Sequence, residues 1–413
     1  MWASLESVVA TVSQALIFVG LIVSAIYCLV MLYSARQFFA RRPDEEGVSD
    51  EPAVTVLKPL KGLDVELYEN LRDLCLQDYG RLQLVFGVAD ALDPAVAVVQ
   101  RLQRDYPQVD IDLVVDARVY GTNYKVSNLH NMYAHAKHDV IVIADSDIRV
   151  PRSYLRQLVR HLRDPRVGLA TTMYRAANTG GAPTLVESLC INTDWCHMVL
   201  VARIVERASY AFGATIAMRR AVLDEIGGFL PFVDYLADDY QLGQRVVARG
   251  YQLALSHQVL ETLISLGSWR RLIQHQLRWA RTYRVCRPGG YFGSIFTHAT
   301  LWAVLNVSFH EFSAASCLAS GALVALRYAS AALLCWRYLG ADTTPAQLAL
   351  LAPKDLFVSV VWVLAFLGDN VTWSGRRFRV LPDGKMLDVT PGAAVPHSWT
   401  PLPEVHRRGA SAD

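Results

Sequence analysis

The sequence predicts an α/β protein with a mostly parallel sheet, flanked on both sides by membrane helices. Short aliphatic runs alternate with helical patterns between residues 50 and 290, which is typical of a parallel sheet covered on both faces. Val12–Tyr33 contains no charged residue, and about 20 apolar residues are enough to cross a bilayer. A second apolar block occupies Ile295–Leu339. We therefore expect a membrane-attached α/β domain.

The strands are expected where β-branched and aliphatic residues form short uninterrupted runs. Helical patterns separate these runs. In open α/β sheets, ligands bind beyond the carboxyl ends of the strands, so the residues that follow each run are the first candidates for a site. The expected strands are Val54–Leu57, Leu82–Val88, Ile111–Val115, Val140–Ala144 and Val167–Thr171, and the expected helices are Glu66–Gln77, Pro94–Asp105, Lys125–Ala136 and Ser153–Leu162.

Four segments are expected along the chain. The first is an N-terminal transmembrane helix within residues 1–35, and the second is the α/β domain over 50–290. Transmembrane or interfacial helices follow over 291–375, and a tail over 376–413 is expected to be disordered after Pro391. Arg36, Arg41 and Arg42 follow the first apolar run. Because positive charges near a span remain on the cytoplasmic side, these arginines predict a cytoplasmic α/β domain.

The number of C-terminal membrane segments stays open. A third apolar stretch covers Leu356–Trp373, and His310, Glu311 and Arg327 interrupt the second block. One of these segments is expected to be interfacial or re-entrant. The apolar segment Pro183–Ile204, which carries several polar residues, is compatible either with an interfacial helix or with a buried core helix.

Composition and motifs exclude several classes of function. Forty basic residues against 38 acidic ones give a net charge of only +2, which argues against nucleic-acid binding. No GxGxxG follows an expected strand, and no GxxxxGK[ST] loop is present. Dinucleotide oxidoreductases and P-loop NTPases are therefore disfavoured. The seven cysteines form no CxxC pair, so neither a disulfide framework nor a structural zinc site is expected.

Two acidic residues follow the expected strand Val140–Ala144. Asp145 and Asp147 emerge at the ligand-binding edge of the sheet, and carboxylate oxygens select hard cations such as Mg²⁺ or Mn²⁺. We interpret the pair as a site for a metal and a diphosphate. The alternative is a cap for the helix that starts near Pro151. A second DxD pattern, Asp110-Ile111-Asp112, starts a strand and is interpreted as solvated surface.

Two further clusters carry residue types suited to catalysis. Asp238 and Asp239 stand at the head of a helical segment. A neighbouring charge and partial burial would raise the pKa of Asp239 towards a value useful for a general base. Arg278 and Trp279 lie in the helical run 268–284. A guanidinium can neutralise a departing diphosphate, and an indole can stack on a sugar or on a flat acceptor.

Taken in order, these motifs resemble those of processive-type GT-A glycosyltransferases over residues 50–290. Within that group the sequence is most similar to the ceramide glucosyltransferase family, and particularly to its hopanoid-biosynthesis members, which act on bacteriohopanetetrol. The motifs that carry the resemblance are Lys58-Pro59-Leu60-Lys61-Gly62, Asp90, Lys125-x-x-Asn128-x-x-Asn131, Asp145-Ser146-Asp147, Gly227-Gly228-Phe229, Asp238-Asp239 and Arg278-Trp279.

The resemblance implies a GT-A fold and a UDP-sugar donor. Lys58, Lys61, Asp90, Lys125, Asn128 and Asp145 would bind the nucleotide-sugar, with Asp90 on the uracil ring. Asp145 and Asp147 would hold the metal. Asp239 would be the catalytic base beside Asp238, and Arg278 and Trp279 would close over donor and acceptor. The family has Gln or Arg where this chain has His275, so the role of that position is left open.

The expected function is therefore inverting sugar transfer to a lipid hydroxyl at a bacterial inner membrane. The first expectation is UDP-N-acetylglucosamine as donor and bacteriohopanetetrol as acceptor, as in hopanoid biosynthesis. The alternative is a ceramide glucosyltransferase that uses UDP-glucose. A polysaccharide synthase would need more membrane spans, and a non-catalytic scaffold would have lost the base or the Arg-Trp pair.

Overall fold

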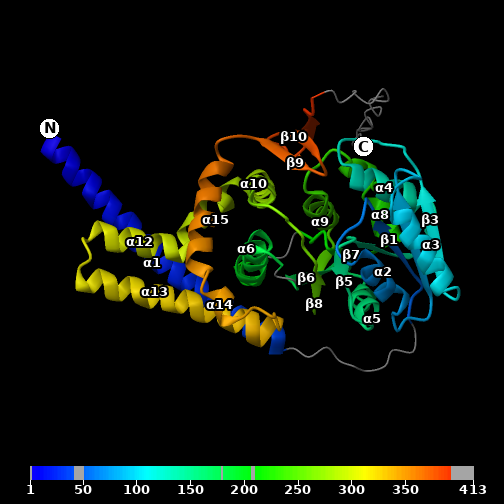
Figure 1. Ribbon diagram of the computed structural model, residues 1–413, viewed down its shortest axis with the longest axis horizontal. Coiled ribbons are helices and arrows are strands. Elements are labelled where there is room, and N and C mark those ends of the chain that lie inside the picture. Colours follow the sequence, from blue (N-terminus) through cyan, green and yellow to red (C-terminus); the bar gives the residue numbers. More distant parts are fainter. Residues whose placement is uncertain (1, 41–50, 178–179, 206–209, 392–413) are drawn as a thin grey trace, which may run out of the picture.

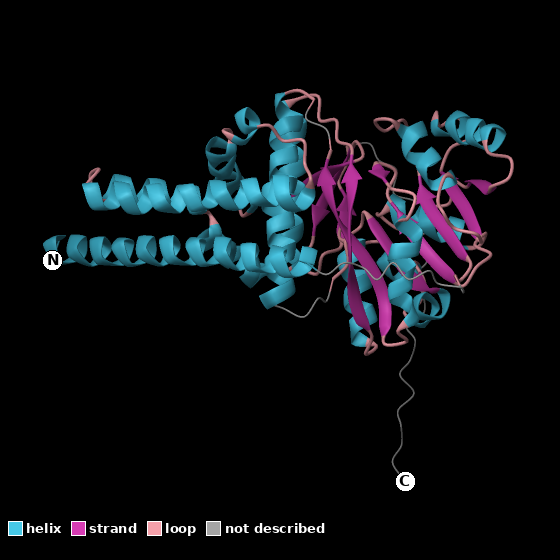
Figure 2. Ribbon diagram, turned by 90° about the horizontal axis from the view of Figure 1, so that it is seen from below, coloured by secondary structure: helices cyan, strands magenta, loops and turns pink. Residues whose placement is uncertain are grey.

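The computed structural model describes residues 2–40, 51–177, 180–205 and 210–391. An α/β body occupies one end of the molecule, and three helices, α1 (Trp2–Ala40), α12 (Ala299–Phe309) and α13 (Ala314–Ala332), project from the other end (Figure 1). The same projection is evident from below, where the long helices extend away from the strands (Figure 2).

The body is built on an eight-stranded sheet in the order β3-β2-β1-β4-β7-β6-β8-β5. Strand β1 pairs in parallel with β2 and β4, β2 with β3, and β6 with β8. Strand β7 runs antiparallel to both of its neighbours, and β5 runs antiparallel to β8. The α/β prediction is confirmed, and β5, β7 and β8 are additions to it. The strands are β1 (Val54–Pro59), β2 (Leu82–Val88), β3 (Asp110–Val115), β4 (Val140–Ala144), β5 (Ile148–Arg149), β6 (Val167–Ala176), β7 (Thr215–Arg219) and β8 (Gln252–Thr262).

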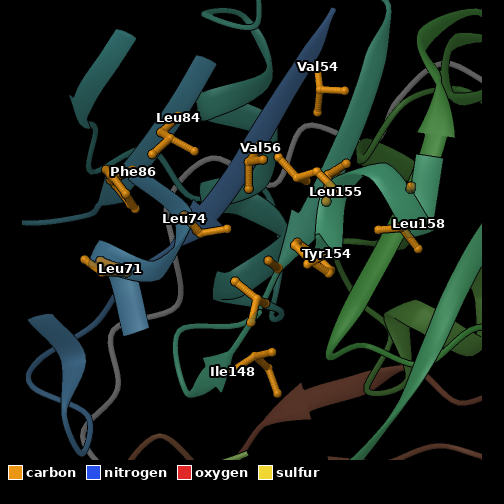
Figure 3. Packing of buried hydrophobic residues seen from close by; sticks show 14 of the residues in the cluster. Val54, Val56, Leu71, Leu74, Leu84, Phe86, Ile148, Tyr154, Leu155 and Leu158 are labelled. Carbon is orange, nitrogen blue, oxygen red and sulfur yellow. The ribbon is translucent and has the colours of Figure 1, made fainter. Parts of the chain in front are cut away.

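Helices cover both faces of this sheet. Successive residues of a strand point to opposite faces, so Val54 and Val56 enter one core whereas Leu57 enters the other. Helices α2 (Leu67–Cys75), α3 (Ala95–Asp105) and α5 (Tyr154–Val159) pack on the first face, which Figure 3 shows from close by. Helices α4 (Tyr124–Tyr133), α8 (Arg220–Glu225) and α9 (Asp238–Ala248) pack on the second. Because both faces are buried, the central strands are apolar throughout.

The segment Pro183–Ile204 is a core helix, not an interfacial one. It consists of α6 (Ala182–Cys190), the π-helical turn η2 (Ile191–Trp195) and α7 (Cys196–Val205). Trp195 is only 6% exposed, because it packs against the sheet and against other side chains of a third apolar cluster. Met31, Ala35 and Phe38 of α1 complete that cluster. The interfacial alternative is therefore wrong for this segment, and α1 is joined directly to the α/β body.

Two helices among the described residues are long and apolar enough to cross a membrane. They are Leu5–Ala40 and Ala314–Leu339, the latter formed by α13 and the π-helical turn η5 (Leu333–Leu339). Helix α12 has 11 residues, about 16 Å at 1.5 Å per residue, which is too short for a hydrocarbon core of about 30 Å. The third apolar stretch is divided, because α15 (Leu351–Ala365) ends before strand β9 (Asn370–Trp373) begins.

A three-stranded antiparallel sheet forms across the boundary between the expected membrane segments, 291–375, and the expected tail, 376–413. Strand β10 (Arg376–Val380) lies between β9 and β11 (Met386–Asp388). Phe378 and Val380 alternate with arginines, and they pack with Leu236 in a small core. This alternation is typical of a strand, but the three arginines of the segment made it look like part of a polar tail. The region after Pro391, which was expected to be disordered, lies outside the described residues. Arg41 and Arg42 also lie outside them.

The remaining helices complete the description of the chain. They are the short helices η1 (Arg160–Arg163), η3 (Leu230–Phe232) and η4 (Ser294–Thr297), together with α10 (Trp269–Cys286), α11 (Pro288–Gly293) and α14 (Pro345–Leu348).

A network of four charges, of which all but Asp194 are buried, joins the projecting helices to the body. Arg327 of α13 contacts Asp194 of η2 at 2.6 Å and Asp355 of α15 at 3.0 Å. Lys354 contacts Asp194 at 2.7 Å and Asp355 at 2.6 Å. Each cation thus meets both anions, which offsets the large cost of removing these groups from water. The network also explains why α13 can contain an arginine.

We expect Arg327→Leu to destabilise the protein by about 3–5 kcal/mol, because it leaves the buried Asp355 and the partly exposed Asp194 with a single cation. Thermal unfolding of the full chain in detergent measures this effect. Arg337→Leu is the matched control, because Arg337 is an exposed arginine in the adjoining turn η5. Equal unfolding temperatures for the two variants would show that the network contributes no stability.

Candidate active site

Charged side chains from four elements meet at the carboxyl ends of β1 and β4. Lys58 lies in β1, Asp145 and Asp147 follow β4, and Lys125 lies in the first turn of α4. Asp238 and Asp239 begin α9. The structure therefore brings these six predicted residues to one edge of the sheet, as expected for chain segments that leave strand ends together.

Lys125 is the cation at the centre of this group. Its Nζ lies 2.5 Å from Oδ1 of Asp145. Burial alone would lower the pKa of Lys125, but the charges of Asp145 and Asp238 outweigh burial and raise it. Asn123 fixes the start of α4, because its Oδ1 accepts a hydrogen bond from the backbone N–H of Val126 at 3.1 Å. The carboxylates therefore keep Lys125 in its charged form, and the cap fixes the start of the helix that carries it.

Asp147 faces a second lysine, Lys58, which is buried. Its Oδ2 accepts a hydrogen bond from Oγ1 of Thr262 at 2.9 Å. Burial and the charge of Asp145 raise the pKa of Asp147 to about 6, although Lys58 opposes the rise. Lys58 is fully buried, and burial lowers its pKa to about 8 against the attraction of Asp147 and Asp145. The charges of Asp147 and Lys58 do not fully compensate the cost of their burial. The two side chains are therefore well placed to bind a charged ligand.

Asp239 is held by two backbone amides. Gly213 N–H donates to Oδ2 and Tyr240 N–H donates to Oδ1, both at 2.7 Å. Burial and the charge of Asp238 raise the pKa of Asp239 to about 6, while Lys125 and the two amides oppose the rise. A Cβ atom at Gly213 would lie 3.2 Å from Oδ2, so glycine permits this close approach. The result is an oriented carboxylate of raised basicity.

Helix α10 brings Arg278 and Trp279 to the same region. Burial lowers the pKa of Arg278, and the negative charge of Glu187 opposes that shift. Glu187 is itself fully buried in α6. Nδ1 of His275 lies 2.8 Å from its Oε1, and Nε2 of Gln276 donates to its Oε2 at 2.8 Å. His275 therefore fastens α10 to α6, and its ring lies 5.1 Å from that of Trp279.

Three predicted residues bond to other parts of the fold and not to this charged group. Nδ2 of Asn128 donates to the carbonyl of Gly87 at 2.8 Å and so ties α4 to β2. Asp90 is exposed, and its Oδ1 accepts from the N–H of Leu92 at 2.9 Å. Lys61 is exposed, and its Nζ lies 3.4 Å from the carbonyl oxygen of Ser374. These residues border the charged group without a direct bond to it.

Sequence reasoning missed four residues that position the site: Asn123, Glu187, Gly213 and Thr262. Two of them carried a usable signal. Asn123 stands three residues before the amide that it caps, which is the N-cap spacing. Glu187 is an acidic residue within an apolar helix, where a buried carboxylate needs partners. Gly213 and Thr262 are recognisable only from the structure, because Gly213 contacts Asp239 and Thr262 contacts Asp147 across long sequence separations.

The two carboxylates after β4 supply only some of the ligands that a divalent metal needs. The described residues contain no group of three or more His, Cys, Asp or Glu side chains that could hold a metal ion. Asp145 and Asp147 nevertheless offer the hard oxygen ligands that Mg²⁺ and Mn²⁺ prefer. The donor set fits a metal that takes its other oxygens from a bound phosphate or from water.

The chain matches a known family along most of its length. The family model of glycosyl transferase family 21 matches residues 16–386. Ceramide glucosyltransferase 3 of Caenorhabditis elegans is 26% identical over 261 residues, which cover 62% of this chain and 56% of that protein. Ceramide glucosyltransferase of Candida albicans is 32% identical over 129 residues, 28% of this chain and 24% of that protein. The matches thus span about half or less of these curated relatives.

Solved structures with similar folds include other glycosyltransferases. A mannosyltransferase from Pyrobaculum calidifontis, in complex with GDP-Man and Mn²⁺, has a TM-score of 0.49 and 20% identity over 85% of this chain and 98% of that chain. TarS of S. aureus (residues 1–349), in complex with UDP-GlcNAc, has a TM-score of 0.40 and 12% identity over 81% of this chain and 98% of that chain.

We expect Asn123→Ala to lower the free energy of unfolding by about 2 kcal/mol. The change removes the cap of α4, worth about 1 kcal/mol, and it leaves the carbonyl of Tyr235 without its 2.8 Å bond from Nδ2. Asn123→Ser retains an acceptor for the cap and is expected to lose about half as much. Chemical denaturation of both variants measures the difference, and equal losses would contradict the capping role.

Proposed function

Because the chain belongs to glycosyl transferase family 21, we propose that it transfers a sugar from a UDP-sugar to a hydroxyl group of a membrane lipid. The observation that carries this proposal is the carboxylate of Asp239, which two backbone amides orient. It lies close to Lys125 of α4 and to the carboxylates that follow β4. A base and a cationic phosphate site are the two parts that such a transfer needs. The two apolar helices support a membrane location.

Asp239 serves as the general base in this proposal. With a pKa of about 6, it is mostly ionised at neutral pH and is still a stronger base than an ordinary carboxylate. It takes the proton of the acceptor hydroxyl while that oxygen attacks the anomeric carbon. The bond from the anomeric carbon to the phosphate oxygen breaks, and its electron pair leaves with UDP. Attack opposite the leaving group converts an α-linked donor into a β-linked product.

The cations of the site stabilise the charge that develops on the diphosphate. Lys125 and Lys58 lie at the end of the sheet, and Arg278 can present two N–H groups to phosphate oxygens. A Mg²⁺ or Mn²⁺ ion held by Asp145 and Asp147 would add a further positive charge at the diphosphate. Preorganised charges of this kind typically lower a barrier by several kcal/mol.

The exposed residues at the border complete the donor site in this proposal. Asp90 would contact the uracil ring, and Lys61 and Asn128 would line the nucleotide side. Trp279 would close over the sugar and the acceptor. The α/β domain would face the cytoplasm of a bacterial inner membrane, because Arg36 directly follows the apolar run of α1.

The relatives favour ceramide as the acceptor and UDP-glucose as the donor. Both curated proteins described above are named ceramide glucosyltransferases. The hopanoid acceptor with UDP-N-acetylglucosamine, which was the first expectation from the sequence, receives no support from these comparisons. We therefore propose the ceramide reaction and retain the hopanoid reaction as an arm of the test.

Purified enzyme in nanodiscs is expected to form glucosylceramide from UDP-glucose and ceramide. Each donor should also be offered with bacteriohopanetetrol, and the glycolipids identified by mass spectrometry. Asp239→Asn is expected to reduce turnover by about 10²–10⁴-fold while UDP binding, measured by calorimetry, persists. Product from bacteriohopanetetrol alone would replace the acceptor assignment, and near-normal turnover by Asp239→Asn would overturn the role of the base.

The rate is expected to depend on pH in two separable ways. Because the active form of Asp239 is ionised and its pKa is about 6, kcat should fall as the pH drops below about 6. Because Lys58 loses its charge above a pKa of about 8, KM for the UDP-sugar should rise above pH 8. Initial rates between pH 5 and 9 measure both effects. A kcat that stays constant down to pH 5 would contradict a base with raised pKa.

A further inference from the structure

A basic groove of about 620 Å³ lies between α10 and the C-terminal sheet, apart from the carboxylates of the candidate active site. Arg270, Gln274 and Arg281 line its α10 side, and their spacing places them on one face of the helix. Thr372 and Arg377, which are partners across β9 and β10, line the opposite side. Its volume is within the range of small-ligand sites.

The three arginines of this groove lack matching negative charges. No acidic residue lines the groove, and none of the three guanidinium groups forms an ion pair with another described residue. Nη1 of Arg281 donates to the carbonyl of Asn370, but its Nε is buried and has no hydrogen-bond partner among the described residues. Asp369, whose charge acts on Arg281, is paired with Arg284. Burial, followed by the charge of Arg284, lowers the pKa of Arg281. An anion would relieve this imbalance.

The position of the groove indicates where the anion comes from. Helix α15 packs against α10 through Val361 and Ala365, and it crosses the bases of the projecting helices (Figure 1). Its other side exposes Leu356, Val360 and Val363 at helical spacing. This exposed apolar face adjoins helices that are long and apolar enough to enter a membrane. The groove therefore lies one helix away from a surface suited to the bilayer interface.

We propose that this groove binds the phosphate of an anionic lipid headgroup in the membrane that holds the protein. Guanidinium groups bind phosphate oxygens through paired N–H donors. Arginines near a membrane surface strengthen binding to anionic lipids. The ligand class is a phosphate-bearing lipid, and none of the residues that line the groove is assigned to the UDP-sugar or its acceptor. The proposal therefore does not rest on the proposed function.

The test uses the full chain in detergent micelles, titrated with phosphatidylglycerol or phosphatidylcholine and examined by native mass spectrometry. The test variant combines Arg270→Gln, Arg281→Gln and Arg377→Gln. The control variant combines Arg104→Gln, Arg152→Gln and Arg249→Gln, which changes the net charge equally at exposed arginines elsewhere. Thermal unfolding of each variant verifies folding, and single substitutions replace the triple variant if it does not fold.

We expect the wild type and the control to retain phosphatidylglycerol in preference to phosphatidylcholine. Each lost groove arginine is expected to weaken phosphatidylglycerol binding about fivefold. Equal binding by the test and control variants would overturn the proposal, as would a lack of preference between the two lipids. Displacement of the lipid by millimolar glycerol phosphate would show that the groove takes a free phosphate, which would overturn the lipid assignment.

Discussion

The mutual repulsion of partly buried carboxylates constrains the whole arrangement at the end of the sheet. Asp145, Asp147, Asp238 and Asp239 can be placed there because Lys125 lies among them and Lys58 lies beneath Asp147. The attraction does not cancel the cost of burial, since the pKa values of Asp147 and Asp239 remain raised. The charges at this edge of the sheet therefore do not balance one another. That residual imbalance is what allows the same residues to take up a cation, a phosphate or a proton.

The central strands and most of the charged residues at the sheet edge could be predicted because both follow from local patterns. Apolar runs locate the parallel strands, and the ends of parallel strands meet at one edge. Strand β8 escaped this reasoning because polar residues interrupt it. Strand β7 escaped it because its apolar run is only Ile216–Met218, between Thr215 and Arg219. The contact between Glu187 and His275 could not be predicted either. Two residues that are 88 positions apart meet only after the sheet and its helices have formed.

Charge burial also determines how the projecting helices are attached. The network of Arg327, Lys354, Asp194 and Asp355 lies where α13, α15 and η2 meet. Such a network is sensitive to geometry, because removing any one partner leaves a buried charge uncompensated. Apolar packing alone would permit these helices to slide against each other. The paired charges fix one arrangement, and with it the position of α10, which packs against α15 and carries Arg278.

Helix α1 continues for 39 residues, about 58 Å, from its exposed apolar segment into the third core cluster. Met31, Ala35 and Phe38 pack within the α/β body, so the apolar helix is held firmly against the domain that carries the candidate active site. In the proposed function, an enzyme attached in this way diffuses in two dimensions and meets its lipid acceptor by lateral collision. Its saturation by an acceptor is then governed by the mole fraction of that lipid in the surrounding leaflet. Diluting the acceptor with inert lipid would slow the enzyme, whereas diluting the vesicles in buffer would not.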